Sequence, residues 1–578
     1  MQIIKTFIKL IAFILPLTVS AQSTYLTQGS KEYHFVDRLE IKQQRNTDLN
    51  FSSLKPFNRK YIVQEVEFID SANKGLLAPE NMPKSQAKLN LSQVDEYNIH
   101  SLLMNNSEWV TGSHDAFKSK LPWLKTFYIT PPNFFEVHNK DFFVAINPVL
   151  QLSVGSEKDN DPRTNDTDGK YVNSRGITLR GMIGSKIGFS STIVDNQERG
   201  PSYYEQYVQS AKAVPGVGFY KRFKKDSSAH DYFDGRGYIT FNATKYIDVQ
   251  FGYDKNFIGN GYRSLFLSDW GNSYLFLKLN TKIWKFNYQN IFMELTPRHI
   301  RNGDSLIDRK YAAMHHLSMN VTKWLNVGLF EAVIFGRSNH FDFQYLNPII
   351  FYRHIEGTVG SPDNALGGLD FKANIMHRFQ LYGQIMLDEF ILNKIKDDPG
   401  YWANKYAIQL GAKYVDAFGI KNLDLQGEIN RVRPFTYSHN DTIGNYTHYN
   451  QPLAHPLGSN FQEFIGIVNY QPVKKLYIHA RVIYYYKGLD SNGVDYGSDI
   501  FRVYTDRPRE SGFKVGNGNK LSVVNALLEI SYEIKQNIFF ELTLQQRNSK
   551  LAFSPGTINS TFVSGGVRIN MFKRQYDY

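Results

Sequence analysis

Residues 538–545 read IFFELTLQ, and the alternation within this stretch decides the fold class. One set of alternate positions holds Ile538, Phe540, Leu542 and Leu544, and the other holds Phe539, Glu541, Thr543 and Gln545. Because successive side chains of a strand point to opposite faces, the stretch predicts a β-strand with one apolar and one mainly polar face. The same period of two recurs at 247–252, 284–292 and 423–429. Most of the chain after residue 138 is therefore expected to be β-structure.

The lengths of the connections favour a membrane barrel over a soluble sandwich. Short connections are predicted at Gly184-Ser185, Thr244-Lys245, Thr281-Lys282, Thr322-Lys323, 472–474 and Lys535-Gln536. Each is followed by a long one, at 196–231, 255–272, 296–310, 336–368, 487–519 and 548–561. Short turns on one side and long loops on the other are typical of outer-membrane barrels, whereas a sandwich has no reason to keep that alternation.

The pattern predicts about 18 strands. They are placed at 140–154, 172–184, 186–195, 232–243, 246–254, 273–280, 282–295, 311–321, 324–335, 369–378, 380–392, 404–414, 421–433, 461–470, 474–486, 520–533, 536–547 and 562–573. An even number suits a bacterial barrel and leaves both of its ends on the periplasmic side, with the short turns. The predicted fold class is all-β: an antiparallel transmembrane β-barrel over residues 139–578, preceded by a small mixed α/β N-terminal periplasmic domain.

The first residues are typical of a signal peptide over residues 1–21. Lys5 and Lys9 give a positive start, an apolar run follows from Leu10 to Val19, and Val19-Ser20-Ala21 resembles an A-x-A cleavage site. A retained anchor is the alternative, although the apolar run is shorter than the roughly 20 residues that a membrane helix needs.

Residues 22–138 are expected to form the N-terminal domain, either in the periplasm or partly plugging the barrel. Ser92-Gln93-Val94-Asp95 resembles a capping box that opens a helix through Leu102 and Leu103.

The composition restricts the partners. The chain has 37 Tyr and 42 Phe, which suit strands, interfacial girdles and sugar-binding surfaces. It has no Cys, which excludes disulfides and thiolate metal sites. The formal net charge of +12 is a feature of nucleic-acid-binding proteins too, but export argues against nucleic acid as a partner. Acidic surface polysaccharide and outer-membrane lipid headgroups match the charge better.

Signatures of catalysis and of metal binding are missing from the sequence. It contains no H-E-x-x-H, no G-x-S-x-G and no P-loop, so we expect no catalytic residues and no cofactor. The acidic loop from Asp159 to Gly169 has carboxylates that suit Ca²⁺, but without the EF-hand spacing a solvated loop is favoured. His439, His448 and His455 share a loop at spacings that match no metal site, so packing is favoured there and no metal is expected.

Two segments carry candidate glycan contacts. Tyr262, Arg263 and Trp270 lie in one long loop, and Tyr352 and Arg353 lie in another. Aromatic faces stack on sugar rings and Arg pairs with carboxylates, so these residues are predicted to bind a glycan. The alternative is that both segments fold inward as a lid. The face that would line the lumen carries Asp248, Lys285, Asp424, Glu428, Arg481, Glu541 and Arg568, which either line a conduit or pair with one another.

Several stretches resemble a known group of proteins. They are HFVDRLEIK (34–42), FIGNGYRSLFLSDWGNSYLFLKLNTKIWKFNYQN (257–290), FGRSNHFDFQYLNPIIFYRHIEGTVGSPDNALGGLDFKANI (335–375), NRVRPFTYSHND (430–441) and YNQPLAHPLGSNFQE (449–463). The resemblance is to the RemB family of gliding-motility proteins and, more distantly, to the Wzi capsule-assembly family. It implies an 18-stranded outer-membrane barrel with a periplasmic helical region. For Wzi it further implies binding of surface polysaccharide, and for RemB a cell-surface role in gliding.

The resulting hypothesis is a non-enzymatic protein of the cell outer membrane, associated with gliding motility or with the assembly and attachment of capsule. Its expected partners are outer-membrane lipid, surface polysaccharide and proteins of the gliding or secretion machinery. An outer-membrane pore or transporter for polar solutes is the alternative. A glycan hydrolase is a third class, but it needs two carboxylates at catalytic separation, and no such pair stands out in the sequence.

Overall fold

The structure is a computed structural model that describes residues 23–76, 89–120, 122–161, 169–184, 186–223, 228–301, 303–349, 351–360, 362–389, 391–554 and 556–578. The expected signal peptide lies outside these residues, as do Ser185 and residues 162–168 of the acidic loop.

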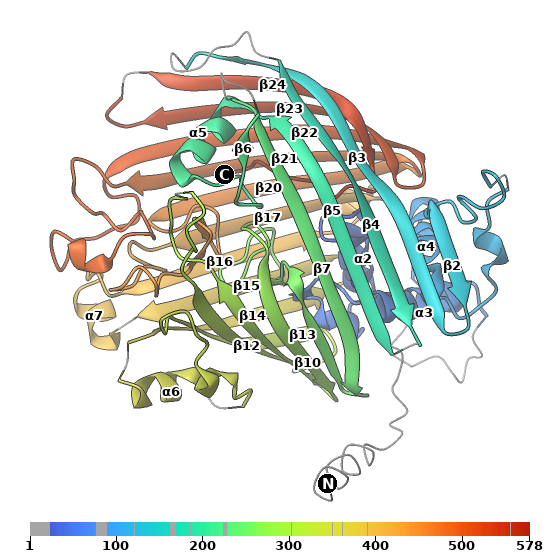
Figure 1. Ribbon diagram of the computed structural model, residues 1–578, viewed down its shortest axis with the longest axis horizontal. Coiled ribbons are helices and arrows are strands. Elements are labelled where there is room, and N and C mark those ends of the chain that lie inside the picture. Colours follow the sequence, from blue (N-terminus) through green and yellow to red (C-terminus); the bar gives the residue numbers. More distant parts are fainter. Residues whose placement is uncertain are drawn as a thin grey trace, which may run out of the picture.

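A closed antiparallel barrel forms most of the molecule (Figure 1). Within the described residues its wall has eighteen main strands: β3 (Phe142–Asp159), β4 (Lys170–Ile183), β5 (Ile187–Arg199), β7 (His230–Thr244), β8 (Ile247–Asp254), β10 (Tyr274–Ile283), β11 (Phe286–Leu295), β12 (Lys310–Asn320), β13 (Leu325–Phe335), β14 (Asn364–Ile375), β15 (Phe379–Glu389), β16 (Lys405–Tyr414), β17 (Leu423–Val432), β20 (Phe461–Val473), β21 (Leu476–Leu489), β22 (Asn519–Lys535), β23 (Ile538–Leu551) and β24 (Thr557–Ile569). Pairing of β24 with β3 closes the ring. Two short strands, β2 (Phe135–Asn139) and β6 (Lys221–Arg222), pair with β3 and β7.

The predicted barrel and its strand number are confirmed, with local corrections. The turn expected at Thr281-Lys282 lies at Trp284-Lys285, so Lys285 is exposed in a turn instead of lining the lumen. The loop expected at 548–561 is largely strand, because β23 continues to Leu551 and β24 begins at Thr557. The last strand, expected at 562–573, ends at Ile569. The first two boundaries shift because polar residues continue the alternation beyond the apolar core of a strand. The last strand ends early because residues 570–578 turn back into the barrel.

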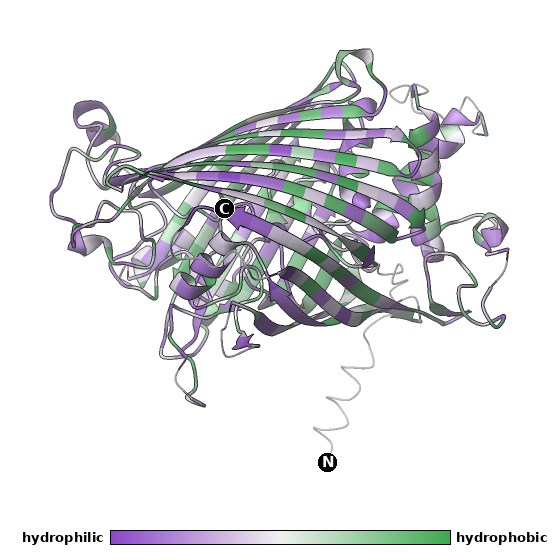
Figure 2. Cartoon of the chain, turned by 90° about the horizontal axis from the view of Figure 1, so that it is seen from above, coloured by the Kyte–Doolittle hydropathy of each residue, from purple (hydrophilic) through white to green (hydrophobic). Residues whose placement is uncertain are grey.

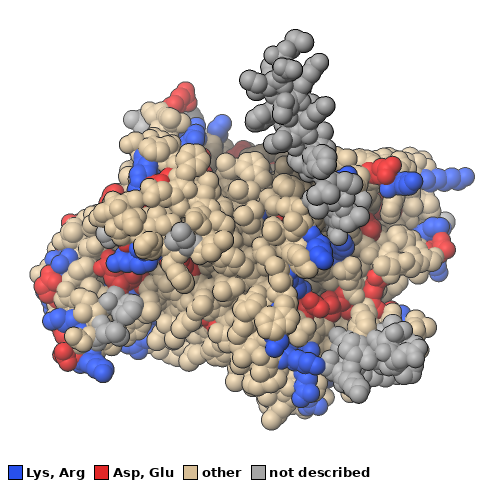
Figure 3. All heavy atoms as spheres, turned by 90° about the horizontal axis from the view of Figure 1, so that it is seen from below, with Lys and Arg blue, Asp and Glu red and all other residues tan. Residues whose placement is uncertain are grey.

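The alternation of side chains in the wall is the one that the sequence predicts. On β23, Leu542 and Leu544 are 48% and 45% exposed on the outside, whereas Gln545 is buried inside. Green and purple alternate along the strands in Figure 2. In the face shown by Figure 3, charged groups gather toward the two ends of the barrel and are sparse between them. An apolar outer band with a polar lumen is the arrangement that a lipid bilayer requires of a barrel.

A layer of helices covers the end of the barrel where the short turns lie (Figure 1). It consists of α2 (Lys31–Gln43), η1 (Leu49–Phe51), β1 (Leu54–Lys55), α3 (Arg59–Asn73), α4 (Gln93–Asn105), η3 (Ser107–Trp109) and η4 (His114–Phe117), which we call the N-terminal layer. It has its own apolar core, which includes Phe35, Val36, Leu39, Val63, Val66 and Leu102. The predicted capping box is present: Asp95 N donates to Ser92 Oγ at 3.0 Å, and Ser92 N donates to Asp95 Oδ2 at 2.9 Å.

A buried charge network fixes the N-terminal layer to the wall. Arg38 of α2 contacts Asp95 of α4 at 2.7 Å and Asp424 of β17 at 2.5 Å. It also contacts Asp416, in the turn before β17, at 2.5 Å, and Lys42 contacts Asp95 at 2.8 Å. A charge that leaves water must be paired, so these contacts dock the layer in one position.

The remaining elements lie in connections between strands. They are α5 (Ser202–Ala211), β9 (Phe257–Ile258), η5 (Phe343–Leu346), α6 (Tyr352–Thr358), α7 (Leu392–Asp397), η6 (Ala417–Gly419), β18 (Thr447–His448), β19 (Gln451–Pro452) and η7 (Tyr504–Asp506). Helices α6 and α7 lie at the end opposite the N-terminal layer (Figure 1). Among the helices that the structure describes, none has the length and apolar character needed to cross a membrane.

Candidate ligand-binding site in the lumen

Loop 255–272 crosses the lumen between β8 and β10. Leu265 N donates to the side-chain oxygen of Gln384 on β15 at 2.8 Å. Tyr262 N and Arg263 N both donate to the carboxylate of Glu428 on β17, at 2.7 and 3.1 Å. The backbone approaches so closely that a Cβ on Gly261 would stand 2.4 Å from Glu428 Oε2. A residue without a Cβ is therefore required at position 261 by the close contact with the opposite wall.

Arg263 is the centre of a buried cluster formed by Tyr262, Arg263, Glu463, Arg481 and Asp577, which we call the Arg263 cluster. Arg263 is 3.2 Å from Glu463 Oε1 of β20 and 3.2 Å from Asp577 Oδ2. Arg481 of β21 donates to the hydroxyl of Tyr262 at 2.5 Å, and that hydroxyl contacts Asp577. Burial raises the pKa of Asp577, but the charges of Arg263 and Arg481 outweigh it and lower that pKa below its ordinary value.

The C-terminal tail, residues 570–578, also lies inside the barrel. It follows β24 and turns back into the barrel, where Asp577 joins the Arg263 cluster. Arg547 of β23 donates to Tyr578 O at 2.8 Å. The ring of Tyr578 packs edge-on to Trp270, with centroids 5.6 Å apart, and Trp270 packs edge-on to Tyr207 of α5 at 5.6 Å. The tail thus joins α5, loop 255–272 and the wall.

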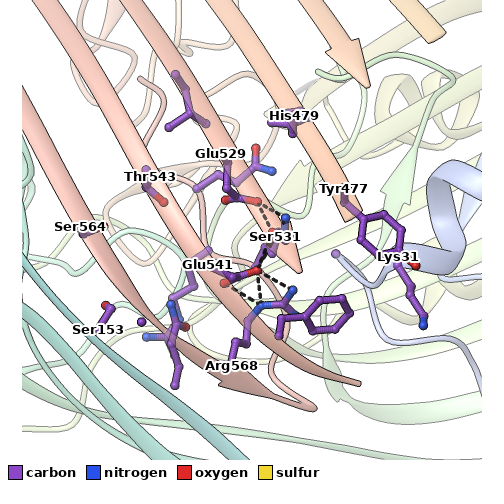
Figure 4. A pocket seen from close by; sticks show the side chains of 18 of the residues that line it. Lys31, Ser153, Tyr477, His479, Glu529, Ser531, Glu541, Thr543, Ser564 and Arg568 are labelled. Carbon is purple, nitrogen blue, oxygen red and sulfur yellow. Dashed lines mark hydrogen bonds and ion pairs between the residues drawn. The ribbon is translucent and has the colours of Figure 1, made fainter. Parts of the chain in front are cut away.

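Two cavities lie in the lumen beside the tail. The strand cavity, about 320 Å³, is lined by strands β20 to β24, β3 and part of α2. Figure 4 shows Glu529, Glu541 and Arg568 extending into it, with Arg568 bound to Glu541 at 2.8 Å. The loop cavity, about 380 Å³, lies between the N-terminal layer and loop 255–272. Lys573, Arg574, Gln575 and Tyr576 of the tail border both cavities.

The structure brings together three of the five predicted glycan contacts. Tyr262, Arg263 and Trp270 all line the loop cavity. All three also contact other parts of the protein, as expected if the loop folds inward. The same residues can therefore pack inside the barrel and line a cavity for a ligand. A cavity with aromatic rings, guanidinium groups and amides can hold a polar ligand of saccharide size.

Tyr352 and Arg353 lie elsewhere, on the outside of the wall. Phe330 and Ala332 of β13 belong to the lumen core, so Glu331 between them faces outward. The described residues of segment 336–363 cover this outer face: Arg353 N donates to Glu331 Oε1 at 3.0 Å. The Tyr352 ring is fully buried, 3.9 Å from the His315 ring of β12, whereas the Arg353 side chain is 72% exposed. The segment therefore does not close the lumen.

The histidines of loop 433–460 serve packing. His455 contacts Glu463 at 2.7 Å, and His448 contacts Ser273 O at 3.0 Å and accepts from Thr296 N at 3.0 Å. Within the described residues, no three His, Asp or Glu side chains are grouped as metal ligands.

Sequence reasoning missed the tail and its contacts with residues such as Arg263 and Trp270, which were themselves singled out from the sequence. Asp577 and Tyr578 follow the last predicted strand, and nothing in their sequence indicates that the chain turns inward. The strand pattern does predict that Glu463 faces the lumen, because it alternates with outward-facing Phe464 on a predicted strand. Its partner Arg263 is 200 residues away, so the pair itself carries no local signal.

Three solved structures illustrate what this chain is similar to. The solved structure of Wzi from Escherichia coli, described as a carbohydrate-binding β-barrel involved in group 1 capsule assembly, matches with a TM-score of 0.51 at 12% identity. The match covers 94% of this chain and 98% of that one. OprD from Pseudomonas aeruginosa matches with a TM-score of 0.39 at 11% identity, over 73% of this chain and 94% of its own. OccAB4 from Acinetobacter baumannii gives 0.41 at 10% identity, over 74% of this chain and 98% of its own.

No curated protein sequence matches this chain. The family model for the capsule assembly protein Wzi, however, matches residues 235–550, which is more than half of the chain and includes loop 255–272 and Glu463. The resemblance to RemB proteins has no counterpart in these comparisons. With its closed barrel and apolar outer band, this protein is an outer-membrane β-barrel that belongs to the Wzi capsule-assembly family.

Proposed function

We propose that this protein binds surface polysaccharide at the outer membrane and acts, without catalysis, in assembling or attaching a capsule. The observation that carries the proposal is the loop cavity, where Tyr262, Arg263 and Trp270 offer aromatic faces and a guanidinium inside a barrel of the Wzi family. Aromatic faces bind sugar rings, and guanidinium groups bind acidic sugars. The Wzi structure that matches over nearly its full length is described as carbohydrate-binding, which supports the same function here.

The absence of catalysis is part of the proposal. The strand cavity holds two carboxylates, Glu529 and Glu541, as a glycan hydrolase would require. Each is bound to a cation, Glu529 to Lys573 and Glu541 to Arg568. These ion pairs already occupy both carboxylates, so the strand cavity does not offer the two available carboxyl groups that hydrolysis of a glycosidic bond requires.

Gene deletion tests the proposal in the cell. We expect the deletion strain to retain less capsule and the full-length gene to restore it. A RemB-like role in gliding is the narrower alternative, supported by the resemblance of stretches such as 257–290 and 335–375 to that family. Loss of colony spreading with normal capsule would favour gliding, and a strain unchanged in both properties would refute both roles.

We further propose that residues 1–21 are removed on export and that the N-terminal layer faces the periplasm. Its position at the end with the short turns supports this orientation. N-terminal sequencing of the protein from outer membranes should then begin at Gln22. A mature protein that begins at Met1 would contradict the cleavage.

A further inference from the structure

The charge of the loop cavity is unbalanced. Among its lining side chains, seven are Lys or Arg and three are Asp. Five of the cations lie within 4.0 Å of a carboxylate: Lys413 near Asp37, Arg236 and Arg574 near Asp234, Arg263 near Glu463, and Lys573 near Glu529. The other two, Lys55 and Lys255, have no such partner in the part of the chain that the structure describes.

Lys255 is an almost completely buried residue that lines the loop cavity. The residue is 7% exposed, and its Nζ has no hydrogen-bond or ion-pair partner among the described residues. Burial, followed by repulsion from Arg236, lowers the pKa of Lys255 to about 7. The carboxylates around it are otherwise engaged or farther away: Asp254 accepts from the backbone N of Lys255, and Asp234 binds Arg236. The third, Asp269, lines the same cavity beyond ion-pair distance.

Lys55 reaches the same cavity from the N-terminal layer. Strands β1 and β9 pair so that Lys55 stands opposite Phe257, two residues after Lys255. The Lys55 Nζ lies 4.9 Å from the centroid of the Phe257 ring, and burial lowers the pKa of Lys55. Lys55 from the N-terminal layer and Lys255 from loop 255–272 therefore line the same cavity.

Two further donors around the cavity make no hydrogen bond. Arg263 Nε and Arg574 Nη2 are buried and have no hydrogen-bond partner among the described residues, although Arg574 Nη2 lies 3.7 Å from Asp234 Oδ2. Leaving a buried donor unpaired costs free energy, and leaving a buried cation unpaired costs more. An anion with several oxygen atoms would satisfy both kinds of group at once.

We propose that the loop cavity binds an oxyanion, held by the ammonium groups of Lys55 and Lys255. The oxyanion is either the carboxylate of an acidic sugar or phosphate. As an acidic-sugar site, it deepens the proposed polysaccharide-binding function and rests on it. As a phosphate site, it does not depend on the proposed polysaccharide-binding function. The cavity volume of about 380 Å³ accommodates a single sugar unit more readily than a folded stretch of polymer.

Calorimetric titration of the purified full-length protein in detergent micelles tests the inference. The ligands are sodium glucuronate, inorganic phosphate and neutral glucose. We expect at least one of the two anions to bind, with an affinity that falls as sodium chloride is added. The double variant Lys55→Met/Lys255→Met should bind that anion at least about tenfold more weakly. Lys255→Arg, which keeps the charge, should retain most of the binding.

Lys285→Met is the matched control, because it removes one positive charge from an exposed turn away from the cavity. Circular dichroism shows whether each variant keeps its β-structure, and Lys255→Arg keeps the test decisive if the double variant fails to fold. Binding of glucuronate alone assigns the site to an acidic sugar, and binding of phosphate alone assigns it to free phosphate.

The inference is overturned if neither anion binds, or if the folded double variant binds as the wild type does. Failure of the proposed function has a different result. A protein that still binds neutral polysaccharide but no anion would keep the proposed function and lose the oxyanion site. A protein that binds phosphate but no polysaccharide would do the reverse.

Discussion

Trp270 shows how one residue serves both packing and recognition. Its indole ring packs edge-on to Tyr207 and Tyr578, while the residue also lines the loop cavity. The surrounding tyrosines hold the ring in place, so a sugar that stacks on it loses little side-chain entropy on binding. An indole that is ordered before binding is a better sugar platform than a freely rotating one.

Replacing Trp270 with Ala should therefore weaken polysaccharide binding about tenfold, as expected when one aromatic contact of about 1.5 kcal/mol is lost. Titration of purified protein with capsule polysaccharide measures the effect. Trp284→Ala is the control, because Trp284 is 77% exposed in a short turn at the other end of the barrel from the loops. Equal affinities of the two variants would exclude Trp270 as a contact.

Gly261 is required by the close approach of loop 255–272 to the wall. We expect Gly261→Ala to destabilise the barrel by about 1–3 kcal/mol, because the added methyl would collide with Glu428 Oε2 and with the carbonyl of Arg263. Urea unfolding in detergent micelles measures the change. Gly427→Ala on β17 is the control, since a Cβ there has no atom within 4 Å. A Gly261 variant as stable as this control would show that the loop can move away from Glu428.

At the scale of elements, the docking of α2 depends on Arg38. One guanidinium binds three carboxylates, from α4, from β17 and from the turn before β17. A buried ion network of this kind is weak evidence for net stability, but removing one member leaves the others unpaired. The contribution of Arg38 to docking is therefore measured by replacing its side chain.

Arg38→Met should reduce the free energy that docks the N-terminal layer onto the barrel by about 3–5 kcal/mol, while the barrel stays closed. Hydrogen exchange measured by mass spectrometry should show faster exchange in Lys31–Gln43 and Gln93–Asn105 and little change in β22 and β23. Lys74→Met, at an ion pair on the surface of the same layer, should have almost no effect. Unchanged exchange in α2 would contradict a docking role for Arg38.

Acid should release the same layer. Burial raises the pKa of Asp37 in α2, but the charge of Lys413 outweighs it and brings that pKa to about 2. A carboxylate with a lowered folded pKa stabilises the docked state above its ordinary pKa of about 4, and the stabilisation is lost as the pH falls toward 2. Exchange in α2 should thus rise between about pH 4 and pH 2. Asp37→Asn should exchange faster already at neutral pH and respond less to acid over that range.

At the scale of the whole molecule, the barrel is filled from three directions. The N-terminal layer covers one end, loop 255–272 crosses the middle, and the tail lies between the two cavities. Such an interior is what a binding protein needs, whereas an open pore requires a continuous aqueous path.

We therefore expect the full-length protein to give no stable current in planar bilayers. Removing residues 570–578 should produce measurable conductance, because the tail borders both cavities and holds Arg263 and Arg481 through Asp577. Asp577→Asn tests the same contact if the shortened chain does not fold, and it should give brief openings. A stable open current in the wild-type protein would instead support the pore.

The sequence by itself determined the barrel, its eighteen strands and the inward-facing side. A period of two is a local property: Phe540, Leu542 and Leu544 have to face the same way whatever surrounds them. The capping box at Ser92 was predictable for the same reason, since its two hydrogen bonds join residues three positions apart. The residue types of the candidate site were also readable, and three of the five chosen residues share one cavity.

Only the tertiary structure decided what occupies the lumen. Arg263 meets Glu463 and Asp577, which are 200 and 314 residues away, and segment 336–363 covers the outer wall instead of closing the barrel. A strand pattern says which way a side chain points but not which distant loop it meets. Those contacts depend on the pairing of buried charges and on the closure of the barrel, both of which exist only in the folded chain.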